Sequence, residues 1–352
     1  MADWTSSMQQ TFEYYVVDPE TWMDVKKLNG VKSSAISRDS EAETLGSATI
    51  DIDGSIDECY VRIYLITIQN GMREKHPLGT FLVQTPSTKF DGKTQSVSLD
   101  AYTPLLELKE NKPPIGYSVM KNENIMDRAW RLSQEHARAP VVRADCPTTV
   151  YYDFVADTSD TWLTFLRDFI ANAKYSFALD ELGRILFSPK QDTASLQPVW
   201  TYDDGNSSIL YPDVSIDRDL YGIPNVVEVI YSNGVDSYYA KVVNDDSNSP
   251  ISTVSRGREI IYRVTDPDLA GNPSENEIKE YAERLLRELS TLEYTISYTH
   301  GYCGTRIGDC VRLNYSKAGL TNVKAKIISQ SIKCEPGCPV TEKAVFTNKL
   351  WR

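Results

Sequence analysis

Alternating apolar and polar residues mark most of the first hundred positions and predict β-strands. In YVRIYLITIQ (60–69), the residues Val61, Ile63 and Leu65 recur at every second position, as one buried face of a strand requires. The other face carries Tyr60, Arg62 and Tyr64, so we expect it to be covered or to contact a partner. Segment 12–100 is divided by short turn sequences, namely Asn29-Gly30, Asp53-Gly54, Asn70-Gly71 and Asp91-Gly92. It is therefore predicted to form an antiparallel sheet, closed into a barrel.

The pattern changes to helical spacing after Pro104 and the sequence NKPPIG. Segment 122–139 predicts a helix that begins at a cap on Asn122 or Asn124. Segment 160–173 predicts a second helix, capped by Ser159 or Asp160, with a core-facing stripe of Trp162, Phe165, Leu166 and Phe169. The sequence from Tyr175 to Lys190 then predicts a hairpin that turns between Asp180 and Gly183.

Strand patterns return near Trp200 and continue to the end of the chain. They are interrupted by one helix at about 274–289, where Ser274 is the cap and Glu277 stands three residues later. The predicted strands lie at 225–234, 236–245, 259–266, 293–300, 309–316, 324–334 and 343–350. We therefore predict a mainly β protein with an α+β middle. The expected domains are a first β-barrel at 1–105, an α+β domain at 106–200 and a second β-barrel with the inserted helix at 201–352.

Charge and composition exclude several classes of function. The formal net charge of -12 would make a surface that faces nucleic acid repulsive. No apolar run approaches the roughly 20 residues of a spanning helix, and the first ten residues lack the pattern of a secretion signal. We therefore expect a protein made in a cytoplasm that neither inserts into a membrane nor binds DNA tightly. Six cysteines in 352 residues are too few for a disulfide scaffold.

Motifs of catalysis are absent from the sequence. It has no nucleophile elbow, phosphate-binding loop, dinucleotide glycine pattern or zinc-protease helix, and its three histidines, His76, His136 and His300, are widely separated. The pairs Asp203-Asp204 and Asp245-Asp246 lie in Ser/Asn/Gly-rich stretches typical of solvated turns. We predict no enzymatic activity, no catalytic residue and no cofactor.

Two acidic or cysteine-rich stretches resemble metal sites at first sight. In DIDGSIDE, Asp51, Asp53 and Asp57 are spaced like calcium ligands, but an EF-hand needs glycine sixth and glutamate twelfth, where this chain has Ile56 and Arg62. The cysteine pairs are Cys303 with Cys310 and Cys334 with Cys338; only the second pair has the spacing of a zinc knuckle, and Pro336-Gly337 between them equally suits a type II turn. We predict no bound metal and reduced thiols. The sequence does not indicate whether the four cysteines cluster in space.

The order of these elements resembles one family, the baseplate or tail hub proteins of tailed bacteriophages and related contractile injection machines, which are similar to the base of the type VI secretion spike. The resemblance depends on four stretches: 76–108 at the close of the first barrel, 160–190 with its helix and hairpin, 223–234, and 275–313, where a helix, a strand and the turn Gly308-Asp309 lead into the next strand. Each stretch is a weak motif, and their order carries the likeness.

The resemblance implies two tail-tube-like antiparallel β-barrel domains plus a helix-containing domain, assembled as a homotrimer. Two barrels from each of three subunits would form a pseudo-sixfold ring that joins a hexameric tail tube, or a distal tail ring, to a trimeric spike or tip. Tape measure protein and viral DNA would pass through without specific binding, and the protein would belong to a virion tail assembled in the host bacterial cytoplasm. The chain stops at Arg352, directly after its last predicted strand. We therefore expect no lytic or receptor-binding role for this chain.

Two other classes of function remain open at this point. A carbohydrate-binding tail fiber or adhesin module would display clusters of exposed aromatic residues in loops, and Trp4, Trp22 and Trp200 are candidates for them. A tail-associated hydrolase is the third class, although its motifs are missing. The sequence does not indicate the particle, its host, its neighbouring proteins, or whether its tail contracts.

Overall fold

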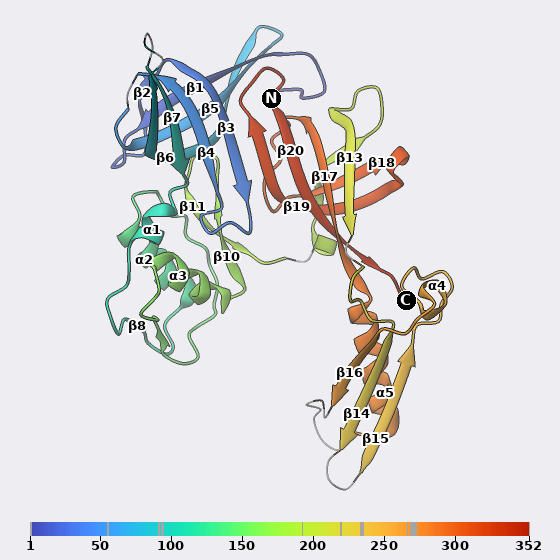
Figure 1. Ribbon diagram of the computed structural model, residues 1–352. Helices are drawn as coiled ribbons and strands as arrows, with labels where there is room; N and C mark the ends of the chain where they lie inside the picture. Colours follow the sequence, from blue (N-terminus) through green and yellow to red (C-terminus); the bar gives the residue numbers. More distant parts are fainter. Residues whose placement is uncertain are drawn as a thin grey trace. The chain divides into compact units, whose positions relative to one another are not determined.

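The structure is a computed structural model that describes residues 2–54, 56–90, 92, 95–191, 193–218, 220–232, 236–265, 267 and 273–351. The chain forms two compact units: unit 1 comprises 1–214 and 298–344, and unit 2 comprises 215–297 and 345–352 (Figure 1). Parts of four predicted turns or strands lie outside the described residues, at Asp91, at 93–94, at Asn233-Gly234 and at Asp266. The predicted boundaries at 105 and 200 stay predictions.

The first β region of unit 1 is an antiparallel array in the order β3-β4-β7-β6-β5-β1-β2. Its core contains Val61, Ile63 and Leu65, as their alternation predicts. The strands are β1 (Gln9–Val17), β2 (Asp24–Leu28), β3 (Val31–Asp39), β4 (Gly46–Asp53), β5 (Cys59–Gln69), β6 (Met72–Phe90) and β7 (Gln95–Tyr102).

The second β region continues the same sheet, because β19 pairs with β3 over Ser329–Lys333 and Ala35–Asp39. Thirteen strands are thereby joined, along a path from β13 through β17, β20 and β19 to β3 and onward to β2. The strands of this region are β12 (Pro198–Asp203), β13 (Leu210–Arg218), β17 (Thr291–Gly301), β18 (Cys310–Tyr315), β19 (Leu320–Lys333) and β20 (Pro339–Lys349); η2 (Ser316–Ala318) lies between β18 and β19. We call the β3–β19 contact the seam.

Two expectations about the sheets need correction. Strand pairing among the described residues follows an open path and closes neither region into a barrel. The pairing is also not antiparallel throughout, since β12 lies parallel to β18, with Trp200 beside Val311. Alternation of residue types predicts strands but not their partners, because a strand can present the same face in either direction.

The α+β middle packs against the first β region within unit 1. Its helices bury the predicted stripe of Trp162, Phe165, Leu166 and Phe169 in a core that also takes in Tyr60 and Leu82 of the sheet. Its elements are α1 (Leu106–Glu110), β8 (Ser118–Val119), α2 (Ile125–His136), β9 (Phe154–Val155), α3 (Trp162–Ala171), β10 (Tyr175–Leu179), β11 (Ile185–Pro189) and η1 (Thr193–Ser195).

The helix caps show how local sequence defines these ends. Asn124, one of the two predicted residues, caps α2 by accepting a hydrogen bond from the Asp127 backbone. The cap of α3 is Thr161, in a capping box with Thr164, and not Ser159 or Asp160 as predicted. The Asp160 carboxylate instead accepts the Thr164 hydroxyl and the Asp157 backbone N–H. Three adjacent residues of capping type compete here, and the hydrogen bonds of the turn decide among them.

Unit 2 consists of a small sheet covered by the predicted helix. The order is β15-β14-β16, with β14 antiparallel to β15 and parallel to β16. The helix α5 (Glu275–Leu289) begins in the predicted Ser274–Glu277 capping box and buries Ile278, Ala282 and Leu286 on this sheet. The other elements are β14 (Val226–Ser232), β15 (Ser237–Val243), α4 (Thr253–Arg256) and β16 (Ile261–Thr265). In the part of the chain that is described, no helix is both long and apolar enough to cross a membrane.

Candidate functional site

A buried pair of opposite charges lies inside the second β region. His300 of β17 and Glu342 of β20 have no exposed side-chain surface, and Nε2 lies 3.2 Å from Oε1. Alternation along each strand places them there: Ile296 and Tyr298 precede His300 on the inward face of β17. Two unpaired charges would be very unfavourable at this depth, so the pair requires full hydrogen bonding.

The Glu342 carboxylate has that full set of partners. Oε1 accepts hydrogen bonds from the Thr305 hydroxyl at 2.7 Å and from Gln330 Nε2 at 2.6 Å, while Oε2 accepts the Tyr298 hydroxyl at 2.7 Å. Burial by itself would raise the pKa of Glu342. The hydrogen bonds and the charge of His300 outweigh burial and hold this pKa below its ordinary value. The group is therefore an anion in the interior.

The His300 ring is fixed on both sides. Nδ1 donates to the Gly301 carbonyl oxygen at 2.6 Å, and Nε2 lies 3.0 Å from the Tyr202 hydroxyl. Burial lowers the pKa of His300, but hydrogen bonds to Cys303 and Glu342 and the carboxylate charge raise it to about 10. His300 is thus an imidazolium at neutral pH, whereas burial chiefly keeps the Tyr202 pKa well above its usual value and that hydroxyl neutral.

The buried cluster also connects the two β regions. Gln330 of β19 donates to Glu342 and accepts from Arg38 Nη1 of β3 at 2.9 Å. Arg38 Nη2 in turn donates to the Leu78 carbonyl oxygen of β6. A chain of hydrogen bonds therefore runs from the interior of the second β region across the seam. We call His300, Glu342 and their side-chain partners Tyr202, Tyr298, Thr305 and Gln330 the buried cluster.

Cys303, His300 and Glu342 together resemble, at first sight, the nucleophile, base and carboxylate of a catalytic triad. The Cys303 sulfur lies 3.9 Å from His300 Nδ1 and 3.3 Å from the Tyr202 hydroxyl. However, Nδ1 is bonded to a backbone carbonyl, and the pair beside it has no exposed surface that a substrate could reach. The arrangement joins β17, β19 and β20 through hydrogen bonds to Glu342, and its charged pair is enclosed.

A second constellation attaches the β10–β11 hairpin to the sheet. The Leu182 carbonyl oxygen accepts three hydrogen bonds, from Trp22 Nε1 at 2.8 Å, the Thr80 hydroxyl at 2.9 Å and Arg62 Nη2 at 3.2 Å. Gly183 has a φ of +77°, and a Cβ at this position would lie 2.6 Å from the Thr80 Cβ. The hairpin thus binds Arg62 on the face of β5 that also carries Tyr60 and Tyr64, and all three residues are buried. The sequence predicted that this face is either covered or in contact with a partner, and the structure shows it covered within the chain.

The same hairpin turn also contacts the second β region. Glu181 pairs with Arg306 at 2.6 Å, and its side chain is only 11% exposed. Arg306 begins the predicted turn, in which its backbone N–H donates to Asp309 and Gly308 has a φ of +90°. Burial raises the pKa of Asp309. The sequence around Gly308-Asp309 therefore forms a turn that leads into β18, as predicted.

The cysteines occupy different surroundings. Cys303 belongs beside the buried cluster, Cys310 begins β18, and Cys334 and Cys338 pack on the core of the first β region. All are free thiols, and burial raises the pKa of Cys334 to about 11. Within the described residues no three His, Cys, Asp or Glu side chains gather so as to hold a metal ion. The absence of bound zinc stays a prediction.

The remaining candidates have structural partners. His76 lies 3.0 Å from the Thr67 hydroxyl, and His136 stacks on Trp162. Asp203 accepts the Gly205 backbone N–H, and Asp246 accepts that of Asn248, as turn residues do. Lys32 pairs with Asp53 at the end of β4, where the calcium-like sequence forms a strand end and a turn.

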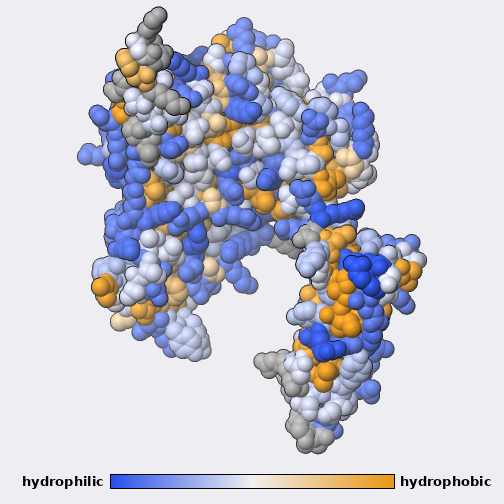
Figure 2. Space-filling view, in the orientation of Figure 1, coloured by the Kyte–Doolittle hydropathy of each residue, from blue (hydrophilic) through white to orange (hydrophobic). Residues whose placement is uncertain are grey.

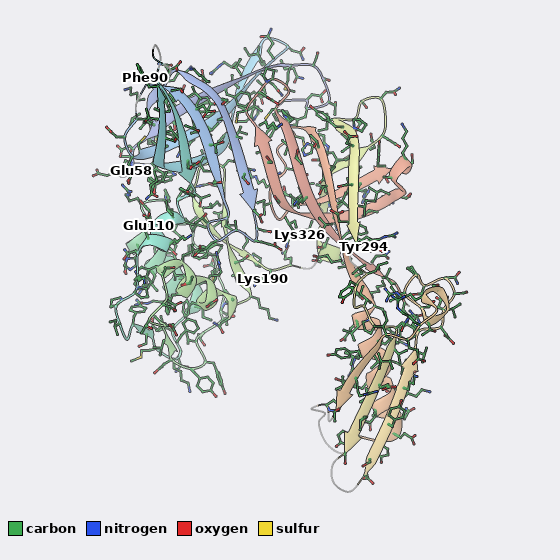
Figure 3. The ribbon with its side chains drawn as sticks, viewed as in Figure 1. Glu58, Phe90, Glu110, Lys190, Tyr294 and Lys326 are labelled. Carbon is green, nitrogen blue, oxygen red and sulfur yellow. The ribbon has the colours of Figure 1, made fainter. Side chains whose placement is uncertain are left out.

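A small cavity of about 310 Å³ opens beside the first β region. Tyr60 and Leu82 supply apolar lining, and Glu58, labelled in Figure 3, is one of its charged residues. Arg138 also lines it, but its guanidinium is paired with Glu107 at 2.5 Å. The other charged lining residue is Asp18, and we assign the cavity no ligand.

The fold, which combines a 13-stranded sheet, an α+β middle and a small helix-covered sheet, is similar to the folds of two solved tail proteins and of the Francisella PdpA–VgrG complex. The resemblance inferred from the sequence is thus confirmed at the level of the fold. No family model matches the chain, and no curated protein matches its sequence.

Two solved tail proteins align with nearly the whole chain. The tail protein from Neisseria meningitidis MC58 aligns with a TM-score of 0.62 and 13% identity, covering 96% of both chains. The 43 kDa tail protein of prophage MuSo2 from Shewanella oneidensis aligns with a TM-score of 0.62 and 12% identity, and the alignment covers 95% of this chain and 96% of that protein. A chain of the Francisella PdpA–VgrG complex aligns with a TM-score of 0.56 and 8% identity, and the alignment covers 98% of this chain and 53% of that chain. At these identities the likeness establishes the fold alone.

Proposed function

We propose that this chain is a structural protein of a phage-type tail, the hub that joins the tail tube to the spike or tip. Support comes from the fold, which aligns over nearly its full length with two tail proteins. It also comes from the absence of an accessible catalytic constellation among the described residues, since the charged pair of the interior is enclosed. The proposal includes no enzymatic activity and a location in the virion tail, after assembly in the host cytoplasm.

The observation that carries this proposal is the seam. Because β19 pairs with β3, the two β regions of one subunit form a single sheet, fixed further by the bond from Arg38 to Gln330. Three subunits would present six such regions around one axis, which is what a ring beneath a sixfold tube needs. Cyclic closure also limits the assembly to a fixed number of copies.

The deciding test is an image of the tail tip that contains this chain. We expect three copies in a ring that adjoins the tube or a distal tail ring on one side and the spike or tip on the other. One copy, or six equivalent copies, would contradict the proposal. A monomer in isolation would not, because trimer formation can require the tube or spike, so the particle itself is the sample.

The passage of tape measure protein and DNA through the ring belongs to the same proposal. The net charge of -12 supports a channel wall from which a polyanion is repelled. Its test is given with the other predictions below.

Carbohydrate binding is the second candidate, and one observation favours it. Tyr151 and Tyr152 are 74% and 72% exposed, and their rings meet edge to face at 4.6 Å in a loop of the α+β middle. Trp22, by contrast, is buried beneath the hairpin. A glycan-binding screen of the protein and of Tyr151→Ala/Tyr152→Ala would decide, since this candidate requires binding that the double variant loses.

A further inference from the structure

The strand β15 forms a regular and unprotected edge of the sheet in unit 2. Its seven residues, Ser237–Val243, pair with β14 from Ser232 to Val226 without a register shift. Among the described strands β14 is its only partner, so the opposite side of β15 presents a row of backbone N–H and C=O groups. An edge of this kind is a template for pairing with another strand.

Another edge strand of the same chain shows the protection that β15 lacks. In unit 1, β2 ends the large sheet with only five residues, and Lys26 and Lys27 stand exposed on it. Its pairing with β1 is also irregular, with a register shift at Val16 and Val17. Shortness, lysines and irregular pairing are the usual means of blunting an edge. The strand β15 has the sequence SYYAKVV, with one lysine and no proline.

We propose that β15 pairs antiparallel with β15 of a second copy of this chain, about a two-fold axis at Ala240. In this register Tyr239 lies opposite the partner subunit's Lys241, and Lys241 opposite the partner subunit's Tyr239. The same register places Tyr238 opposite the partner subunit's Val242 on the other face. The result is one six-stranded sheet made from two units.

Side-chain complementarity selects this register. It pairs all seven residues, and cross-strand partners are Tyr with Lys on the open face and Tyr with Val on the face toward α5. A two-fold axis at Lys241 would set two like charges against each other, and an axis at Tyr239 would pair only the residues from Ser237 to Lys241. Antiparallel pairing about a two-fold axis is also self-limiting, because the same surface is used on both copies.

The face of the sheet opposite α5 strengthens the case. Figure 1 shows α5 behind the strands of unit 2, and Figure 2 shows hydrophobic and hydrophilic residues side by side on the face turned to the viewer. On that face Ile230, Tyr239 and Ile261 are 38%, 55% and 45% exposed. The Tyr239 hydroxyl donates to Glu228 at 3.1 Å, which holds its ring beside the edge. Pairing at the β15 edge would cover part of the Tyr239 ring, which is the member of this surface that lies on β15.

The contact goes beyond the proposed hub function. It relates two copies by a two-fold axis, whereas the ring would relate three by a threefold axis. If the β15 contact is disproved, the ring proposal still stands on its own experiment, and the reverse also holds.

The test is the mass of the full chain in solution. Sedimentation equilibrium over a wide range of concentration should give a monomer–dimer equilibrium that reaches about twice the chain mass of 39.7 kDa. Hydrogen exchange of the β15 amides should slow as the dimer forms. A monomer at every concentration, or a trimer with no dimer, would overturn the proposal.

A pair of matched variants tests the register. Tyr239→Lys introduces two Lys–Lys oppositions across the axis and should weaken dimerisation about tenfold. The swap Tyr239→Lys/Lys241→Tyr restores a Lys opposite a Tyr and should return dimerisation toward that of the wild type. Both positions are on the surface of the sheet, so each variant is expected to fold, and circular dichroism checks this. Dimerisation that Tyr239→Lys leaves unchanged, or that the swap fails to restore, would refute this register.

Discussion

His300 and Glu342 are the residues where a single change should matter most to stability. His300→Gln removes the cation and leaves the Glu342 carboxylate buried with only its neutral donors. We expect the free energy of unfolding to fall by about 3–5 kcal/mol, measured by denaturant titration. The double variant His300→Gln/Glu342→Gln should lose clearly less than the sum of the single changes, because no charge then remains buried.

The same pair predicts a dependence of stability on pH. The folded-state pKa of His300 is raised from 6.5 to about 10, so its stabilising contribution is complete below pH 6.5 and is lost as the pH rises toward 10. The pKa of Glu342 is lowered, so its contribution is present above about 4.5 and is lost in more acidic solution. The unfolding free energy of the wild type should therefore decline from pH 6.5 upward, and His300→Gln should flatten that decline. An equal decline in both proteins would exclude His300 as its source.

The cysteines should hold no metal in stoichiometric amount. Cys334 and Cys338 pack in a core, whereas Cys303 lies beside the buried cluster. The pair with zinc-knuckle spacing therefore does not gain the other two cysteines as further ligands. Elemental analysis of protein purified without chelator should give well under one zinc or iron per chain. A full equivalent that disappears in Cys334→Ser/Cys338→Ser would contradict this prediction.

At the residue level, the sequence carries a signal for the buried charge that the prediction missed. The alternation in TISYTH predicts a strand, and it also places His300 in the same row as Ile296 and Tyr298. A histidine in a row of apolar residues indicates a buried imidazole, and this signal could have revealed the buried charge. Its partner could not have been found in this way, because Glu342 lies on another strand and the pairing depends on sheet topology.

Among the elements, the β10–β11 hairpin offers a matched pair of glycine substitutions. Gly183→Ala would add a strained φ of +77° and a clash with Thr80, whereas Gly116→Ala, at a φ of +78°, would meet nothing within 4 Å. The shared strain should cost about 1–2 kcal/mol in each variant, and the clash should add about 1–3 kcal/mol in Gly183→Ala alone. Thermal unfolding of the two variants measures the difference. Equal losses would show that the hairpin turn does not press on the sheet as described.

Elements were predictable where their signals are local. The hairpin turn at Asp180–Gly183 and the capping box of α5 were both readable from adjacent residues. The packing partner of each element could not be predicted in this way, because partners such as Leu182 and Trp22 lie 160 positions apart in the sequence. The strands 225–234, 236–245 and 259–266 were likewise expected in the second barrel, and they pair with one another in a separate small sheet.

For the molecule as a whole, the charge of -12 predicts behaviour toward DNA. We expect no salt-sensitive binding of duplex DNA at physiological ionic strength, because a net negative protein repels phosphates and releases few counterions. Fluorescence anisotropy with labelled duplex, with a basic DNA-binding protein as the positive control, measures this. Tight binding that weakens steeply with salt would contradict an unobstructed DNA channel.

The seam has a consequence for how the protein is made. Arg38 and Gln330 are 292 positions apart, so the ribosome releases β3 long before it synthesises the strand that covers its edge. At roughly 5–20 residues per second, that edge waits for on the order of 15–60 s. During this interval the nascent chain carries a strand with one unpaired edge, which chaperones or neighbouring nascent chains can capture. Yield in an expressing cell should therefore depend on translation rate and chaperone supply more than the stability of the finished sheet would suggest.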